Sequence, residues 1–236
     1  NYNQEATSDD GSCQYNSAMW YVSIDGNDQA CGSLDQPVNS IQKAINLSSD
    51  GDTVYVYSGT YYENINFNGK NISLIGENRE TTIIDGSQIY YNIVLINSGE
   101  SSASLSHFTI QNGNYNQPGT AILLSNNSHA ILNNLFINNN NSEGEGAGIF
   151  INEGSSAYIS ECDITNNTSS KGGGIFLQNT GDVSIINSII SGNEALYNGG
   201  GITVDGANPL LENLIISNNS AENGGGIFLD GASSPN

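Results

Sequence analysis

The segment Lys171-Gly-Gly-Gly-Ile175 returns almost unchanged as Asn198-Gly-Gly-Gly-Ile202 and as Asn223-Gly-Gly-Gly-Ile227. Looser copies stand at residues 119–122 and 146–149, so the isoleucine that closes each copy recurs every 25 to 27 residues. A fixed period of this length is typical of repeat proteins, in which each repeat forms one structural unit that stacks on the next.

A second set of isoleucines keeps the same period and shows that the repeat extends beyond the glycine segments. Its members are 26 or 27 residues apart: Ile84, Ile110, Ile137, Ile164, Ile190 and Ile216. Between the two sets lie short apolar alternations separated by Gly, Asn and Ser, which are typical of strands and turns. The sequence therefore predicts an all-β coil of three short strands per 26 or 27 residues, each strand pairing with its equivalent in the next coil.

Asparagine is the commonest residue, with 37 copies among 236 residues, and its positions follow the repeat. One column stands three residues after the second isoleucine set and holds Asn140, Asn167, Asn193 and Asn219. Asn accepts left-handed turn conformations, and its amide can bond to the same group one coil away. We therefore expect a structural ladder of Asn side chains at one corner of the coil and the glycine segments at another.

The beginning of the chain does not follow the repeat. Residues 37–45 combine a Ser cap with apolar residues at helical spacing, and residues 53–57 alternate as a strand does. A short helix here would cap the open end of the first coil. The predicted organisation is an extension over residues 1–36, a capping helix with the first strand over 37–59, and coils over 57–236 without an evident C-terminal cap.

The three cysteines have different surroundings in the sequence. Cys13 and Cys31 flank a turn-rich segment, which predicts a disulfide that closes this loop, with two free thiols as the alternative. Cys162 occupies an apolar position of the repeat, so we expect a small buried core residue there.

The chain is strongly acidic, with 4 Lys+Arg against 24 Asp+Glu and a net charge of −20. Such a protein repels phosphate backbones and anionic lipids, which excludes nucleic acid and membrane surfaces as partners. No stretch approaches the ~20 apolar residues of a membrane helix, so we expect no transmembrane segment.

Residues 21–28, 37–45, 50–54 and 59–63 resemble the opening of secreted right-handed parallel β-helix proteins of the pectin-lyase-like superfamily. The glycine segments, paired with Ile137-Asn-Asn-Asn140 and its copies, resemble the GGA[I/L]…FxxN repeats of polymorphic outer-membrane proteins, with Ile in place of Phe. The resemblance implies a right-handed parallel β-helix in an extracellular or cell-surface protein. It does not single out an activity, because the superfamily includes lyases, glycosidases, esterases, adhesins and fibres.

The resemblance implies that a lyase of this superfamily would use a Lys or Arg base beside calcium-binding carboxylates. The chain has four basic residues, which are Lys43, Lys70, Arg79 and Lys171. Arg79 lies close in sequence to Glu77, Glu80 and Asp85, a grouping that favours an ordinary surface ion pair. General acid–base catalysis needs placed carboxylates or a tuned base, and we therefore assign no catalytic residue.

Asp25 and Asp28 are the candidates for metal binding. Their close-spaced oxygens are of the kind that calcium accepts, although the Asp25-Gly26 pair is equally typical of a turn. The sequence predicts no cofactor, with calcium at these two residues as the alternative.

In the strand after each glycine segment, an outward position should alternate with the buried isoleucine. Large apolar residues fill this position in four copies: Leu123, Phe150, Phe176 and Phe228. On a solvent-facing strand, such a strip is typical of a contact surface, either for lateral packing or for stacking on sugars. The alternative is that another part of the chain, such as residues 111–118, covers it.

These observations together favour a non-enzymatic extracellular β-helix with a structural or adhesive role, as a subunit of a surface assembly or filament. The expected partner is a second copy, bound end to end or laterally, with glycans as a further partner. The alternatives are a carbohydrate-active enzyme, either a polysaccharide lyase or a glycosidase, and a carbohydrate-binding module.

Overall fold

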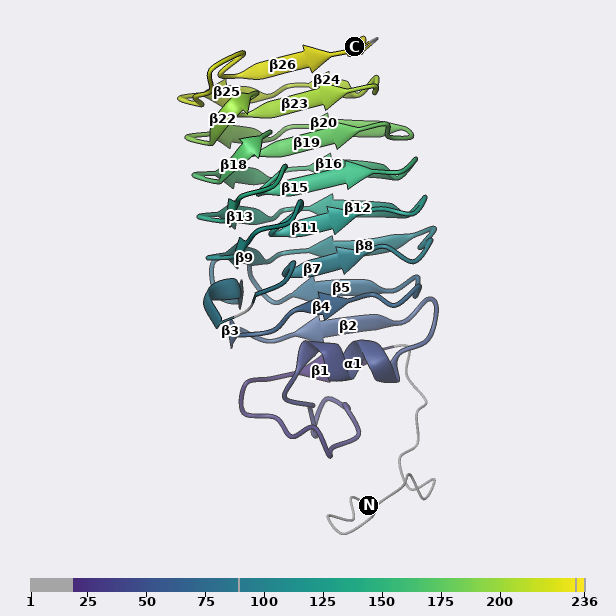
Figure 1. Cartoon of the computed structure of the whole chain (residues 1–236). Coiled ribbons are helices and arrows are strands. Elements are labelled where there is room, and N and C mark those ends of the chain that lie inside the picture. Colours follow the sequence, from purple (N-terminus) through teal and green to yellow (C-terminus); the bar gives the residue numbers. More distant parts are fainter. Residues whose placement is uncertain (1–18, 89, 232, 236) are drawn as a thin grey trace.

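The computed structural model describes residues 19–88, 90–231 and 233–235, which wind into a stack of coils (Figure 1). Each coil contributes strands to long parallel sheets that run along the stack. The fold is an all-β right-handed parallel β-helix, which confirms the prediction made from the repeat and the resemblance.

Three long sheets form the sides of the stack, and a shorter sheet forms one corner. Sheet 1 contains, in spatial order, β1 (Met19–Val22), β2 (Thr53–Val56), β5 (Ser73–Gly76), β8 (Ala103–Ser106), β12 (His129–Asn133), β16 (Ser156–Ser160), β20 (Val183–Ile186) and β24 (Leu210–Glu212). Sheet 2 contains β3 (Gly59–Tyr61), β6 (Thr82–Asp85), β9 (Thr109–Gln111), β13 (Phe136–Asn138), β17 (Asp163–Thr165), β21 (Ile189–Ser191) and β25 (Ile215–Ser217). Sheet 3 contains β4 (Ile65–Asn66), β7 (Val94–Ile96), β11 (Ile122–Leu124), β15 (Ile149–Asn152), β19 (Ile175–Gln178), β23 (Ile202–Asp205) and β26 (Ile227–Asp230). The corner sheet, sheet 4, contains β10 (Asn114–Tyr115), β14 (Asn141–Ser142), β18 (Thr168–Lys171) and β22 (Glu194–Asn198).

The strands pair through equivalent positions of neighbouring repeats. Ile137 of β13, for example, lies opposite Ile110 on one side and Ile164 on the other. Sheet 4 adds a fourth strand to several coils, for which the sequence predicted three strands. It forms because the residues between the Asn column and the glycine segment are extended and pair with their own copies in the next coil.

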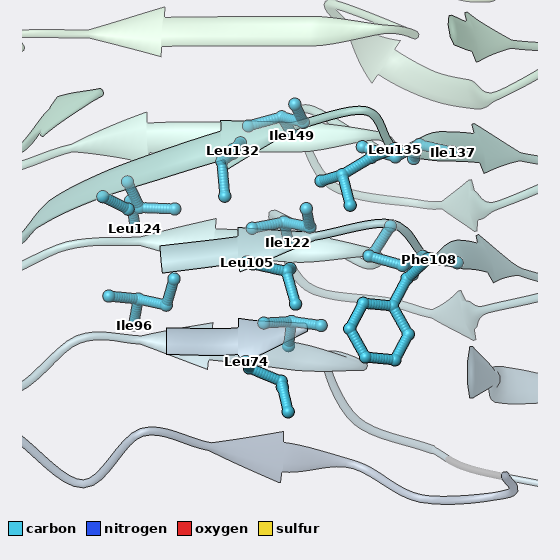
Figure 2. Close-up of a cluster of buried hydrophobic side chains, with 14 of the residues drawn as sticks. Leu74, Ile96, Leu105, Phe108, Ile122, Leu124, Leu132, Leu135, Ile137 and Ile149 are labelled. Atoms are coloured by element: carbon cyan, nitrogen blue, oxygen red, sulfur yellow. The ribbon is translucent and has the colours of Figure 1, made fainter. Parts of the chain in front are cut away.

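The interior of the stack is a column of aliphatic side chains. Leu74, Leu105, Leu132 and Ile159 occupy consecutive strands of sheet 1 in register, and all four are buried. Figure 2 shows the first three of these beside labelled residues of sheets 2 and 3. One coil cannot bury its inner face alone, so stability comes from stacking each coil on its neighbours.

The predicted capping helix is present as α1 (Ile41–Leu47). It begins after Ser40, whose Oγ accepts a hydrogen bond from the backbone N of Lys43 at 3.3 Å. The helix packs against β1, β2 and β4 and buries the apolar residues of one face, which are Ile41, Ala44 and Ile45.

Gln42 of α1 covers the edge of sheet 3. Its Oε1 accepts a hydrogen bond from the backbone N of Asn66 at 2.7 Å, and its Nε2 donates to the Asn66 carbonyl at 3.1 Å. The side-chain amide thereby replaces a neighbouring strand for β4, at an edge that would otherwise be open to another chain.

One part of the predicted N-terminal extension belongs to the coils. β1 pairs with β2 in parallel register and buries Trp20 and Val22. The strand was not predicted because it has no copy in the repeat and stands before the helix. A 3-10 helix, η1 (Gly86–Gln88), lies between β6 and β7, in the second connection from sheet 2 to sheet 3.

Two of the three cysteines lie in the described part of the chain. Cys31 is disulfide-bonded, and its predicted partner, Cys13, lies outside the described residues. Cys162 is buried and free, as expected, and this burial raises the pKa of its thiol to about 12. Within the described residues, no helix has the length and apolar character needed to cross a bilayer.

Candidate functional site

The apolar strip predicted on the outer side of sheet 3 is not a solvent-facing surface. The rings of Phe150 and Phe176 stack with their centroids 5.3 Å apart, and the two residues are 4% and 1% exposed. Leu123 and Phe228, at the ends of the strip, are half-buried. The prediction of an exposed contact strip is therefore wrong at its central pair.

The turn that precedes each strand lies against the base of these side chains. Gly146 and Gly172 have positive φ values of 62° and 61°, a conformation that turns the backbone sharply before the strand begins. A Cβ atom on Gly172 would lie 2.8 Å from the Cβ of Phe176. The corresponding distance from Gly146 to Phe150 is 2.9 Å. Each glycine therefore packs against the base of the phenylalanine side chain, a contact that the alternation of apolar residues alone does not reveal.

The Asn column forms a continuous hydrogen-bonded ladder. Oδ1 of Asn167 accepts from the backbone N of Asn140 at 3.1 Å and from its Nδ2 at 3.0 Å. The same two bonds join Asn167 to Asn193 and Asn193 to Asn219, at 2.9 to 3.0 Å. Each Nδ2 also donates to a backbone carbonyl of another coil. The amides are saturated by the corner itself, which gives them a structural role.

The third glycine of each segment lies against this ladder. A Cβ atom on Gly174 would lie 2.6 Å from the carbonyl oxygen of Gly201 and 3.1 Å from Nδ2 of Asn193. The glycine segments and the Asn column are thus two parts of one corner structure, which explains why they share a period.

Arg79 forms an ion pair with a residue far away in the sequence. Its Nη2 donates to Oδ2 of Asp163 at 2.8 Å, and its Nε to Oε1 of Glu80 at 3.3 Å. Asp85, which lies near Arg79 in the sequence, accepts instead from Ser87, Gln111 and Asn112. Burial opposes the ionisation of Asp85, but these donors together hold its pKa below the usual value.

The remaining basic residues lie at structural positions. Nζ of Lys70 donates to three carbonyl oxygens at the C-terminal end of α1, at 2.7 to 2.9 Å. Lys171 pairs with Glu145 at 3.2 Å, and Lys43 lies within α1. Burial lowers the pKa of Lys70, as a general base requires, but the ammonium is held at the C-terminal end of the helix, where its positive charge is attracted by the negative end of the helix dipole.

Asp28 anchors the start of α1. Its Oδ1 accepts from the backbone N of Asn39 at 2.8 Å and of Ser40 at 2.9 Å, and its Oδ2 accepts from Oγ of Ser40 at 2.8 Å. Both oxygens of this carboxylate therefore have a structural role at the helix start, and the calcium site with Asp25 stays a prediction. Among the residues that the structure describes, no three His, Cys, Asp or Glu side chains are grouped as a metal ion would require.

An aromatic cluster that sequence reasoning missed lies on the outer face of sheet 1. Tyr21 of β1 is in register with Tyr55 of β2, and Tyr57 follows β2. The ring centroids are 6.1 Å apart for Tyr21–Tyr55, 6.2 Å for Tyr21–Tyr57 and 5.4 Å for Tyr55–Tyr57. The sequence indicates this cluster through the alternation of Val and Tyr in residues 53–57, in which the valines point into the core and the tyrosines point to the outer face.

Comparison with known proteins gives two family matches and one curated relative. A family model described as "Pel9A-like, right handed beta helix region" matches residues 20–182, and one for the Chlamydia polymorphic membrane protein repeat matches residues 213–230. Pectate lyase PEL9 of Emericella nidulans is 49% identical over 41 residues, which are 17% of this chain and 10% of that protein's length. No solved structure gives a significant match.

Proposed function

The chain belongs to the Pel9A-like right-handed beta helix family, and from this premise we propose that it is a non-catalytic extracellular β-helix with a structural or adhesive role. The two family matches agree with both resemblances drawn from the sequence. They support a location at the cell surface or outside the cell, which is part of the proposal.

The commitment of three of the four basic side chains to structural contacts is the observation that carries the proposal. A lyase of this superfamily needs a basic residue that faces carboxylates and substrate. Here Lys70 holds the end of α1, Arg79 holds Asp163, and Lys171 holds Glu145. Moving one of these groups to a substrate would break an existing ion pair or helix contact.

A lyase assay tests this proposal directly. β-Elimination of polygalacturonate leaves an unsaturated product whose ultraviolet absorbance can be followed with calcium and with a chelator. We expect no increase in absorbance and no release of reducing ends from neutral or acidic polysaccharides. Calcium-dependent unsaturated product that disappears in the Lys70→Met and Arg79→Met variants would overturn the proposal.

The curated relative favours a second candidate function, a polysaccharide lyase. The observation behind it is the short match with a fungal pectate lyase. Because that match covers a small part of the fungal protein, it supports the shared coil more than the shared chemistry. The assay described above separates the two candidates.

Self-association is a further part of the proposal, and a different surface from the predicted strip supports it. Ile189 of β21 and Ile215 of β25 lie in register on the outer face of sheet 2 and are 37% and 59% exposed. Adjacent exposed isoleucines on neighbouring strands are typical of a surface that another chain covers.

Analytical ultracentrifugation of the purified chain tests this contact. We expect concentration-dependent association that is lost in the Ile189→Lys, Ile215→Lys double variant. Ile131→Lys is the matched control, because Ile131 is exposed on a different sheet. A monomeric wild type, or equal association of all variants, would contradict the proposed contact.

A further inference from the structure

We propose that the Tyr21–Tyr55–Tyr57 cluster is a binding site for a neutral polysaccharide whose ring hydroxyls are equatorial. The inference deepens the adhesive role proposed above, since it names a site and a partner for that role. It rests on three observations: an accessible group of tyrosine rings, a polar rim beside them, and the charge of the protein.

The three rings contact one another in one cluster, and two of them share an orientation. Tyr21 and Tyr57 are nearly parallel, with 22° between their planes, and Tyr55 stands edge-on to Tyr57 at 82°. Tyr21 and Tyr55 alternate with buried residues in their strands, and all three tyrosines are half-buried, so the rings lie on the outer face. A sugar with equatorial hydroxyls has flat faces of C–H groups, which pack well on aromatic rings that carry a polar hydroxyl.

A polar rim borders these rings. Ser58 follows Tyr57, and its Oγ donates to Oε2 of Glu77 at 2.7 Å and lies 2.8 Å from Oγ1 of Thr81. Burial first, and then the charge of Glu77, raise the pKa of Tyr55, which places this carboxylate within electrostatic range of the rings. The hydroxyls of Ser58 and Thr81 and the carboxylate of Glu77 are groups that bind sugar hydroxyls.

Charge decides which kind of polysaccharide fits. Two hydrogen bonds from Ser58 lower the pKa of Glu77, so a negative charge stands beside the rings at neutral pH. The whole chain carries a further excess of acidic residues, with a net charge of −20. The charge of Glu77 and the net negative charge of the chain both repel a polyanion such as polygalacturonate, and neither repels a neutral glycan.

The cluster is also held in place before any ligand binds. Tyr61 donates from its hydroxyl to the carbonyl of Tyr57 at 2.9 Å, and the backbone N of Tyr57 bonds to the carbonyl of Val22. Rings that are fixed by their strands and by one another lose little entropy on binding, which favours contact with a flat ligand.

Titration with cellohexaose, followed by calorimetry and by saturation-transfer NMR on the wild-type chain, tests the proposal. We expect binding that weakens about tenfold in Tyr57→Ala and in Tyr21→Ala, which corresponds to about 1.4 kcal/mol for the lost ring contact. Tyr57→Phe should bind within about twofold of wild type, because the ring remains. Tyr158→Ala is the matched control: this residue is 42% exposed on the same sheet but lies on β16, away from the cluster.

Thermal unfolding of each variant shows whether a loss of binding reflects a loss of fold, and the NMR experiment locates the contact without any substitution. Absence of cellohexaose binding would overturn the site, as would equal binding by the Tyr57→Ala and Tyr158→Ala variants. Tighter binding of hexagalacturonate than of cellohexaose would overturn the choice of partner. None of these outcomes depends on turnover, so the failure of the binding site is distinguishable from the failure of the non-catalytic proposal.

Discussion

Oδ1 of Asn167 accepts two hydrogen bonds from Asn140, one from its side-chain Nδ2 at 3.0 Å and one from its backbone N at 3.1 Å. This pair of bonds joins one coil to the next, and Asn167 repeats it as a donor toward Asn193. The backbone amide at the corner is thereby satisfied by a side chain and not by water. Because the side chains are buried, the ladder adds a polar spine to a stack that is otherwise held by aliphatic contacts.

We expect Asn167→Ala to lower the free energy of unfolding by about 3 kcal/mol, because it leaves the buried backbone N–H of Asn140 without a partner and removes one acceptor of its Nδ2. Asn141→Ala is the matched control, since its side chain bonds to Asn114 at the exposed surface and its loss should cost at most about 0.5 kcal/mol. Urea unfolding of the three proteins measures both values. Equal losses in the two variants would contradict the special role of the buried ladder.

Much of this architecture is readable in the sequence because stacking forces equivalent residues into register. Ile137 lies opposite Ile110 and Ile164 for the same reason that the three are 27 residues apart. The Asn ladder follows from the same logic, since an amide that bonds to its own copy must recur with the period of the coil.

The parts that sequence reasoning missed depend on contacts outside the repeat. Phe176 is buried although it alternates with the inward-pointing Ile175 and Leu177, and the backbone of Gly172, four residues earlier, lies against its Cβ. The partner of Arg79 is Asp163, 84 residues away, because a coil brings distant residues onto one face. Tyr21 meets Tyr55 through β1, a strand that has no copy to reveal it.

The third glycine of each glycine segment allows a second test of the corner structure, because one copy is crowded and another is not. Gly174→Ala should lower the free energy of unfolding by about 2 kcal/mol or more, because its Cβ would lie 2.6 Å from the carbonyl oxygen of Gly201. Gly226 occupies the same place in the last copy, where the nearest atom to a Cβ is 3.4 Å away, so Gly226→Ala should be tolerated. Chemical denaturation of both variants measures the difference, and a larger loss in Gly226→Ala would refute the proposed crowding.

A left-handed position that recurs before sheet 2 offers a way to stabilise the protein. Asn134, Asn187 and Asn213 have φ values of 49° to 52° there, and Glu161 has 56° at the equivalent place. Asn tolerates this conformation better than Glu, so Glu161→Asn should raise the free energy of unfolding by about 0.5–1 kcal/mol. The reverse change, Asn187→Glu, should lower it by a similar amount. Thermal unfolding compares the two, and stabilisation by both changes would show that the backbone conformation is not the cause.

The pH dependence of stability has a distinct contribution from Glu63, which caps α1 from the neighbouring coil. Its Oε1 accepts from the backbone N of Ile41 at 2.8 Å, and its Oε2 from that of Gln42 at 3.0 Å. Burial is the largest influence and raises the pKa of Glu63 above its ordinary 4.5, although the two hydrogen bonds act in the opposite direction.

A carboxyl whose native pKa lies above the unfolded value makes the native state bind more protons in that interval. Its contribution to stability is therefore complete below about pH 4.5 and is lost as the pH rises through the raised native pKa. We expect the free energy of unfolding of the wild type, minus that of Glu63→Gln, to fall between pH 4.5 and neutrality. Urea unfolding over this range measures the difference, with Glu222→Gln, an exposed site, as the control for the loss of one charge. A difference that grows with pH would mean that the two N–H donors outweigh burial and hold the native pKa of Glu63 below its ordinary value.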